Sequence, residues 1–279
     1  HYDYKGSKYF EKITKTKEYY IARTEKNILK KISKEINFIF DEDLTFVEFG
    51  SGSIEKISIL INNNVKYYIS LDISLNFIKK SSKKLQKLFS YLTIIPKYCD
   101  YINYINLPKN TTNTKIGFFL GSSIGNFYNG QEKKFLKNAK KTLGKKNFMF
   151  VGVDLIKEIK ILEKAYNDKR KFTEKFNLNL LNVINKKLKI KIKLNDFKYI
   201  STYNKKKKCM ENFIISKKNQ SFDIKNQKIY FKKNEKVQTE ISNKFTILKF
   251  KSIIKATGWK LKKYWTDQKK YYAVFLLES

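Results

Sequence analysis

Alternation between apolar runs and amphipathic stretches organises the first half of the chain. The apolar runs are short and end near Gly or Asp, as strands do, whereas the stretches between them repeat apolar residues every three or four positions, as helices do. Strands are predicted within LTFVEFGSGS, VKYYISLDIS, YLTIIPKYCD, KIGFFLG and NFMFVGVDL. Because these runs are almost continuously apolar, they indicate a parallel sheet that helices cover on both faces.

The amphipathic stretches predict the helices of this half. Residues 24–36 place Ile28, Ile32 and Ile36 on one face. Further helices are predicted over IEKISILINN, LNFIKKSSKKLQKLF and QEKKFLKNAKKTLG. Ser74 stands directly before the second of these, and we expect its side chain to cap that helix.

A different pattern begins near Ile156. Residues 156–188 predict helices, and residues 197–233 predict short strands within FKYISTY, NFIISKK and KIYFKK. A last helix, FTILKFKSIIKATG, and a strand pair, KLKKYWTD and KYYAVFLLE, are expected to return to the first sheet.

These elements predict an α/β protein with two domains. Residues 25–155 with 245–279 would form a Rossmann-like domain, whose mostly parallel sheet ends in an antiparallel strand pair. Residues 1–24 with 156–244 would form a smaller α+β domain.

Net charge changes this picture less than its size suggests. The chain of 279 residues has a formal charge of +35, which is typical of nucleic-acid binding. However, Arg23 and Arg170 are the only arginines among 60 basic residues, and a nucleic-acid groove favours Arg for its bidentate geometry. Lys, Asn, Ile, Phe and Tyr are the residues of AT-rich codons, so we attribute the charge to compositional drift. A basic nucleic-acid-binding protein or an RNA methyltransferase stays open as an alternative function that would use this charge.

Scarce histidine and cysteine limit the available chemistry. His1 is the only histidine, and Cys99 and Cys209 lie far apart, so neither a His-based triad nor a metal site is expected. Two separate thiols are typical of a cytoplasmic protein. The first ten residues lack the apolar core of a signal peptide, and no run is long enough to span a membrane. We expect a cytoplasmic monomer; the chain does not begin with Met, which indicates a processed or trimmed form or part of a longer protein.

The segment VEFGSGSIEK indicates a ligand site at the end of the first strand. Gly50 and Gly52 let the backbone turn sharply and approach a ligand closely. Asp72, at the end of the next strand, can accept hydrogen bonds from ribose hydroxyls, and Asp100, after the third, can accept from an adenine amino group.

The same segment departs from the dinucleotide fingerprint. It has no third Gly at the usual spacing, and Glu48 precedes the turn, where a carboxylate disfavours a diphosphate. A cationic nucleoside that carries an amino acid suits these residues better. We therefore expect S-adenosylmethionine as the cofactor.

Eight segments give the chain a specific resemblance that extends nearly from end to end. They are KEYYIARTE, VEFGSGSIEK, FLGSSIGNF, GVDLIKE, LEKAYND, FNLNLL, TEISNKF and WTD. With them, the chain resembles the histidine-specific S-adenosylmethionine-dependent methyltransferases, the family of the L-histidine Nα-methyltransferase of ergothioneine biosynthesis. The resemblance implies a class I methyltransferase fold with a cofactor-binding domain and a substrate-binding domain.

The resemblance also implies roles for individual residues. Contacts to the cofactor would come from Gly50, Lys56, Asp72, Asp100 and Tyr101, the last of which is commonly Phe in the family. Contacts to the amino acid would come from Tyr19, Gly121, Asn126, Tyr166, Asn212, Glu240 and Ser242, with Glu240 and Ser242 reading the imidazole ring. Tyr2 and Asn126 would orient the reacting amine as the catalytic groups. In FFLGSSIGNF the expected ligand is then an amino acid and not a phosphate.

The implied chemistry is methyl transfer to the α-amine of histidine, up to the trimethylated betaine. The methyl of a sulfonium is already electrophilic, so the protein mainly has to align a neutral amine with it. A Tyr, a carboxylate or water would take the proton.

One departure concerns the substrate. The family usually has Met where Asn212 follows Glu211, and an amide there would replace an apolar wall of the ring pocket with a hydrogen-bonding group. The same chemistry on a different amino acid or small amine therefore stays an alternative, as does a non-catalytic binding module.

Overall fold

A computed structural model of the protein describes residues 3–52, 54–128, 130–224 and 227–279. The chain divides into two compact units. The unit that we call the sheet unit comprises Arg23–Ile156 and Phe245–Ser279, and the insert unit comprises Lys157–Lys244 with the residues up to Ala22. The assignment of cofactor binding to one unit and substrate binding to the other stays a prediction.

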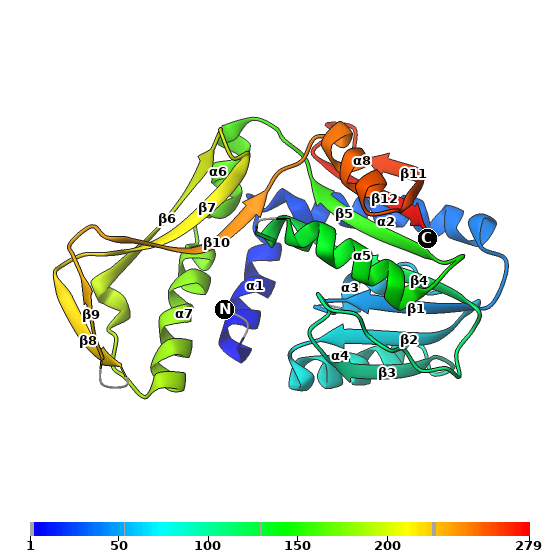
Figure 1. Ribbon diagram of the computed structural model, residues 1–279, viewed down its shortest axis with the longest axis horizontal. Coiled ribbons are helices and arrows are strands. Elements are labelled where there is room, and N and C mark those ends of the chain that lie inside the picture. Colours follow the sequence, from blue (N-terminus) through cyan, green and yellow to red (C-terminus); the bar gives the residue numbers. More distant parts are fainter. Residues whose placement is uncertain (1–2, 53, 129, 225–226) are drawn as a thin grey trace. The chain divides into compact units, whose positions relative to one another are not determined.

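The sheet unit is built on a seven-stranded sheet in the order β11-β12-β5-β4-β1-β2-β3 (Figure 1). Its strands are β1 (Leu44–Phe49), β2 (Val65–Asp72), β3 (Thr93–Tyr98), β4 (Thr114–Phe119), β5 (Phe148–Asp154), β11 (Lys260–Thr266) and β12 (Tyr272–Glu278). Strands β1 to β5 run parallel, and β12 pairs antiparallel with both β5 and β11. The predicted mostly parallel sheet with a closing antiparallel pair is confirmed.

Apolar packing holds helices to this sheet. The helices are α2 (Tyr20–Ile39), α3 (Ile54–Ile57), α4 (Leu75–Leu88), α5 (Gln131–Leu143) and α8 (Ile247–Ala256). Every residue of β1 is buried, and α5 and α8 pack on one face, where Phe135 lies 4.2 Å from Phe119 between ring centroids. Burying one such aromatic side chain contributes roughly 2–3 kcal/mol to the free energy of unfolding.

Two local predictions for the sheet unit were wrong. The helix expected over IEKISILINN is limited to α3, because β-branched residues and the following asparagines favour turns over helix. Ser74 stands before α4, but its hydroxyl makes no capping bond. Its backbone N–H instead donates to the Asp72 carboxylate at 2.8 Å, so the strand end fixes this turn.

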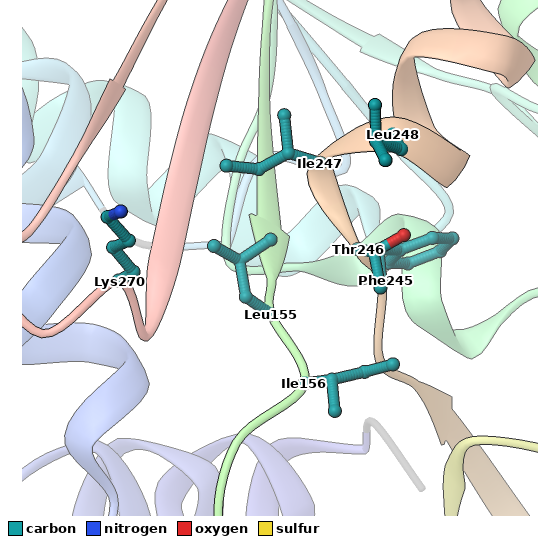
Figure 2. Close-up of a pocket in the computed structure, with 7 residues that line it drawn as sticks. All are labelled: Leu155, Ile156, Phe245, Thr246, Ile247, Leu248 and Lys270. Carbon is teal, nitrogen blue, oxygen red and sulfur yellow. The ribbon is translucent and has the colours of Figure 1, made fainter.

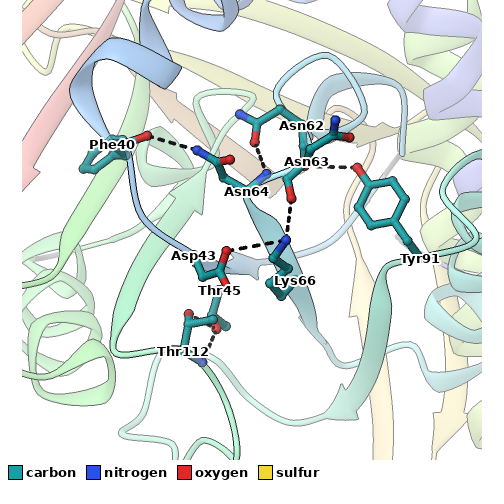
Figure 3. Close-up of polar contacts among 9 residues, drawn as sticks. All are labelled: Phe40, Asp43, Thr45, Asn62, Asn63, Asn64, Lys66, Tyr91 and Thr112. Carbon is teal, nitrogen blue, oxygen red and sulfur yellow. Dashed lines mark hydrogen bonds and ion pairs between the residues drawn. The ribbon is translucent and has the colours of Figure 1, made fainter.

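Polar contacts connect the residues at the amino end of the sheet (Figure 3). Lys66 Nζ donates to the Asn63 carbonyl at 2.8 Å and lies 3.5 Å from Asp43, while the hydroxyls of Thr45 and Thr112 lie 2.7 Å apart. Polar groups at this end of the sheet therefore form hydrogen bonds and ion pairs with one another. In a parallel sheet, ligand chemistry is expected at the opposite, carboxyl edge.

The insert unit combines helices with antiparallel strands. Its helices are α1 (Tyr4–Thr14), α6 (Ile159–Tyr166) and α7 (Phe172–Leu188), and its strands are β6 (Phe197–Asn204), β7 (Cys209–Ser216), β8 (Gln220–Ile224), β9 (Gln227–Phe231) and β10 (Lys236–Asn243). Strands β10, β7 and β6 form one sheet, and β8 and β9 form a hairpin. The predicted strand segments left out β8 and β10, whose exposed or half-buried polar positions hide their alternation.

The Asp3 carboxylate ties α1 to α7. It accepts the backbone N–H of Gly6 at 2.7 Å, which caps α1, and the side-chain amide of Asn179 on α7 at 2.7 Å.

Across the described ranges of the chain, no helix has the length and apolar character needed to cross a membrane.

Candidate active site

The glycine turn after β1 is fixed by the neighbouring strand. The backbone N–H groups of Gly50 and Ser51 both donate to the Leu71 carbonyl, at 2.8 and 3.2 Å. Gly50 has φ +71°, and a Cβ there would lie 3.2 Å from the Tyr101 ring. Both the backbone conformation and the close approach of Tyr101 therefore require glycine.

The two predicted nucleoside-binding carboxylates follow adjacent strands. The Cys99 N–H donates to the Asp72 carbonyl at 3.0 Å, which holds the two strand ends together. Asp72 is half-buried, and burial raises the pKa of its carboxyl. Asp100 is exposed and accepts from the Ile102 N–H at 3.1 Å. Burial, followed by the charges of Asp72 and Asp100, raises the pKa of Tyr101 to about 12, so its phenol stays protonated and can donate.

Glu48 is turned into the core and not toward a ligand. The residue is 4% exposed, and the hydroxyls of Tyr68 and Ser51 donate to its carboxylate. Burial raises the pKa of Glu48 to about 7, although these hydrogen bonds act in the opposite direction. This carboxyl therefore stabilises the turn through its hydrogen bond with Ser51.

The raised pKa of Glu48 leads to a pH-dependent stability. A carboxyl that titrates near 4.3 in the unfolded chain and at about 7 in the folded protein binds more protons in the folded state between these values. The free energy of unfolding should therefore fall as pH rises from about 4.3 to 7. In Glu48→Gln, which cannot titrate, the melting temperature should decline less between pH 5 and 8, with each kcal/mol worth roughly 2–4 °C.

Thermal unfolding followed by circular dichroism across that pH range measures the difference. Burial raises the pKa of Glu240 to about 7 as well, so the variant should keep part of the decline. Equal slopes for both proteins would show that Glu48 is not a source of the pH dependence.

A second buried carboxylate, Glu25 on α2, connects the turn to the loop after β4. It is 0% exposed, accepts the Gly121 N–H at 2.7 Å and the Tyr272 hydroxyl at 2.6 Å, and pairs with the Lys56 ammonium at 2.6 Å. A side chain at Gly152 would collide with Glu25 and Tyr272, which explains the glycine in β5. Glu25 thereby fixes two residues predicted to contact ligands, Lys56 and Gly121.

The loop FFLGSSIGNF uses its hydroxyls for its own structure. Ser122 accepts the Asp154 N–H at 2.9 Å, and Ser123 donates to the Leu120 carbonyl at 3.0 Å. Asn126 ends the short 3-10 helix Ser123–Asn126 and is half-buried. Both serine hydroxyls thus take part in folding the loop.

In the insert unit, one row across three strands carries a polar network. Ser201 of β6, Asn212 of β7 and Glu240 of β10 are consecutive cross-strand partners, so their side chains share one face. The Asn212 carbonyl oxygen accepts the Ser201 hydroxyl at 2.6 Å and the Tyr199 hydroxyl at 2.9 Å. Its amide nitrogen must then face Glu240, and it donates to Glu240 Oε2 at 3.3 Å.

A second cluster lies two residues further along β10. The Tyr166 hydroxyl donates to Ser242 at 2.8 Å, and the Lys244 ammonium donates to both oxygens, at 2.9 and 2.8 Å. The Tyr19 ring packs edge-on against Tyr166, with 6.3 Å between centroids. Because Glu240 and Ser242 are two positions apart on a strand, both side chains point to the same face.

The predicted site residues thus fall into two sets. The sheet unit holds Gly50, Lys56, Asp72, Asp100, Tyr101, Gly121 and Asn126, and the insert unit holds Tyr19, Tyr166, Asn212, Glu240 and Ser242. Tyr2 lies outside the described residues. Sequence reasoning assigned no role to Glu25, Tyr199 or Lys244, although Glu25 and Lys244 stand inside the segments KEYYIARTE and TEISNKF.

An apolar hollow of about 230 Å³ lies elsewhere in the sheet unit (Figure 2). Its lining consists of Leu155, Ile156, Phe245, Thr246, Ile247, Leu248 and Lys270. It adjoins the point where the Ile156 N–H donates to the Phe245 carbonyl at 2.9 Å. None of the predicted site residues lines this hollow, so it is distinct from the candidate site.

The fold defines the class of protein. It is similar to the crystal structure of magnesium protoporphyrin IX methyltransferase from Synechocystis PCC 6803, with a TM-score of 0.53, 9% identity, and coverage of 99% of this chain and 95% of that one. A crystal structure of an S-adenosylmethionine-dependent methyltransferase from Clostridium acetobutylicum also gives a TM-score of 0.53, with 10% identity and 91% coverage of each chain. The mostly parallel sheet with its closing antiparallel pair is the class I methyltransferase fold.

Sequence comparison gives the family. The model of the histidine-specific, SAM-dependent methyltransferases matches residues 1–279, and the chain belongs to this family. S-adenosylmethionine is therefore its methyl donor.

Relatives carry several names. The chain is 27% identical over 275 residues to histidine N-alpha-methyltransferase of Mycobacterium tuberculosis, covering 96% of this chain and 85% of that protein. It is 31% identical over 189 residues to ergothioneine biosynthesis protein 1 of Neurospora crassa, covering 64% and 21%. L-tryptophan methyltransferase of Psilocybe serbica is 24% identical over 293 residues, covering 94% and 81%.

Proposed function

We propose that this protein transfers methyl groups from S-adenosylmethionine to the α-amine of histidine. The observation that carries the proposal is the pair of polar side chains on one face of β10, Glu240 and Ser242, in a chain of the histidine-specific family. A carboxylate and a hydroxyl two residues apart can each address one nitrogen of an imidazole ring. The relative from Mycobacterium tuberculosis adds support through its name.

The cofactor would be held by the turn and the strand ends of the sheet unit. Asp72 would accept both ribose hydroxyls, Asp100 would accept the adenine amino group, and the Gly50 backbone would lie against the nucleoside. The Lys56 ammonium, held by Glu25 at 2.6 Å, would pair with the carboxylate of the methionine part. The bound cofactor supplies a methyl on a sulfonium, which leaves as the sulfur takes the bonding electron pair.

The residues that hold the amino acid would then act by alignment. Tyr19, Asn126 and Tyr166 would bind its amino and carboxylate groups. Fixing the nitrogen lone pair in line with the methyl lowers the entropic part of the barrier. In each transfer the ammonium first loses one proton, and the freed lone pair then forms an N–C bond as the S–C bond breaks; three transfers would give the trimethylated product.

A second candidate keeps the chemistry and changes the amino acid. Asn212 is fully buried and places an amide where the family usually has Met. This amide is hydrogen-bonded to Tyr199, Ser201 and Glu240, so the surface that would face the substrate ring is polar and held in place. A relative named for tryptophan supports a broader range of ring substrates within this sequence neighbourhood.

Calorimetric titration distinguishes the two candidates. Histidine, tryptophan, phenylalanine and lysine are titrated into the protein in the presence of saturating S-adenosylhomocysteine. The proposal expects histidine to bind at least tenfold more tightly than the others, because only an imidazole satisfies both polar groups. Binding of S-adenosylhomocysteine combined with no binding of histidine would refute the choice of substrate and leave the enzyme class intact.

A further inference from the structure

Lys244 is a buried cation beside the residues proposed to read the substrate ring. Its residue is 4% exposed, and its backbone N–H donates to the Lys208 carbonyl at 2.8 Å, which fixes the position of the chain. Its ammonium lies 4.8 Å from the centroid of the Tyr166 ring and donates to the hydroxyl oxygens of Tyr166 and Ser242. A lysine is rarely buried this far without a specific polar environment.

The hydrogens in this cluster can be assigned one by one. An ammonium has three donors and no acceptor, so both hydroxyl oxygens must accept from Lys244. The Tyr166 hydroxyl has a single hydrogen, which it donates to Ser242 Oγ at 2.8 Å. Ser242 Oγ thus accepts two hydrogen bonds, one from Lys244 at 2.8 Å and one from Tyr166. A hydroxyl oxygen has two lone pairs, so only the hydrogen of Ser242 remains for a ligand.

Glu240 offers the opposite polarity on the same strand face. Burial raises the pKa of Glu240 to about 7, and above that pH its carboxylate is ionised and only accepts hydrogen bonds. One oxygen of Glu240 already accepts a hydrogen bond from the Asn212 amide nitrogen at 3.3 Å. The Asn212 amide is held in this orientation because its oxygen accepts hydrogen bonds from Ser201 and Tyr199. Along β10, an acceptor at Glu240 is therefore followed by a donor at Ser242.

We propose that Lys244 is a positioning residue that makes Ser242 a hydrogen-bond donor only, so that the site selects a ring with one N–H and one unprotonated ring nitrogen. This inference rests on the proposed function. A neutral imidazole in one tautomer satisfies both groups: its N–H donates to Glu240, and its bare nitrogen accepts from Ser242. A ring that carries only donors leaves the Ser242 hydrogen facing another hydrogen, and such a buried mismatch is costly.

The test compares histidine with β-(pyrrol-3-yl)alanine, a five-membered-ring analogue that keeps an N–H and has no acceptor nitrogen. Affinities are measured calorimetrically with S-adenosylhomocysteine present, at a pH well above the pKa of about 7 of Glu240, so that this carboxylate is ionised. The wild-type protein should prefer histidine by at least about tenfold. Lys244→Met keeps an unbranched apolar side chain but removes the ammonium, which frees one lone pair of Ser242. Because the Ser242 hydroxyl can then rotate, the preference for histidine over the pyrrole analogue should shrink by about fivefold or more.

Matched variants separate this role from a merely structural one. Lys208→Met changes an exposed lysine next to Lys244 and should leave the preference unchanged. In a Ser242→Ala background, Lys244→Met should have no further effect on the preference, because the two changes act through one hydroxyl. If Lys244→Met fails to fold, Tyr166→Phe provides the second route, since it also frees a lone pair of Ser242 and should reduce the preference.

The outcomes distinguish the inference from the proposed function. An unchanged preference in Lys244→Met, with both ligands weakened equally, would overturn the positioning role and leave histidine as the substrate. A wild-type protein that binds S-adenosylhomocysteine and neither amino acid would overturn the proposed substrate, and the inference with it.

Discussion

Replacing Glu240 with Ala is expected to weaken histidine binding by roughly 100-fold, which corresponds to about 2.7 kcal/mol. The change removes a charge-assisted acceptor for the ring N–H. It also leaves the Asn212 amide, which donates to Glu240 at 3.3 Å, without that acceptor in a buried site. Titration with histidine in the presence of S-adenosylhomocysteine measures the loss.

The control for this experiment is Glu235→Ala. Glu235 stands directly before β10 and is exposed, and its carboxylate accepts the Lys232 N–H in a turn at 2.8 Å. It should leave histidine affinity within about twofold, as expected for an exposed site. S-adenosylhomocysteine should bind normally to both variants. Equal weakening of both ligands in Glu240→Ala would mean that the change damages the fold and does not report on ring recognition.

Replacing Asp72 with Ala is expected to weaken S-adenosylhomocysteine binding by about 100-fold or more. A carboxylate that accepts two ribose hydroxyls makes two charge-assisted hydrogen bonds, each worth roughly 1.5–3 kcal/mol. Asp72 already accepts the Ser74 N–H at 2.8 Å, which aims the carboxylate before a ligand arrives. Asp72→Asn keeps the shape and loses the charge, so its affinity should lie between those of wild type and Asp72→Ala.

Asp43→Ala is the matched control for this second change. Asp43 lies at the amino end of the sheet, where it pairs with Lys66 at 3.5 Å (Figure 3). Its removal should alter cofactor affinity by less than about twofold, since exposed ion pairs contribute little. If Asp72→Ala binds S-adenosylhomocysteine as tightly as Asp43→Ala does, the assignment of the ribose site is wrong.

Much of the sheet unit follows from the sequence because its central strands β1, β4 and β5 are almost entirely buried. A continuously apolar run such as β1 has one stable environment, so its place in a parallel sheet is predictable. Strand β10 was missed because most of its positions are exposed or half-buried and carry polar residues. Its pairing with β7 is decided by tertiary contacts that local patterns do not contain.

Some residues of the candidate site could be predicted from the sequence, and others could not. Gly50 and Asp72 occupy positions that a strand–turn–helix pattern specifies, so they could be named from spacing and the resemblance. Glu25 and Lys244 could not be given roles, because each acts through partners distant in the sequence. Glu25 bonds to Tyr272, and Lys244 bonds to Tyr166, so only the folded chain brings these groups together.

Product analysis after turnover addresses the substrate and the chemistry at once. The protein is incubated with histidine and S-adenosylmethionine that carries a ¹³C-labelled methyl, and the product is examined by mass spectrometry and NMR. We expect labelled methyl groups on the α-nitrogen only, added one at a time up to three, with an unmodified imidazole ring. Label on a ring nitrogen, or no label on histidine from protein that binds S-adenosylhomocysteine, would show that the protein is not a histidine α-amine methyltransferase.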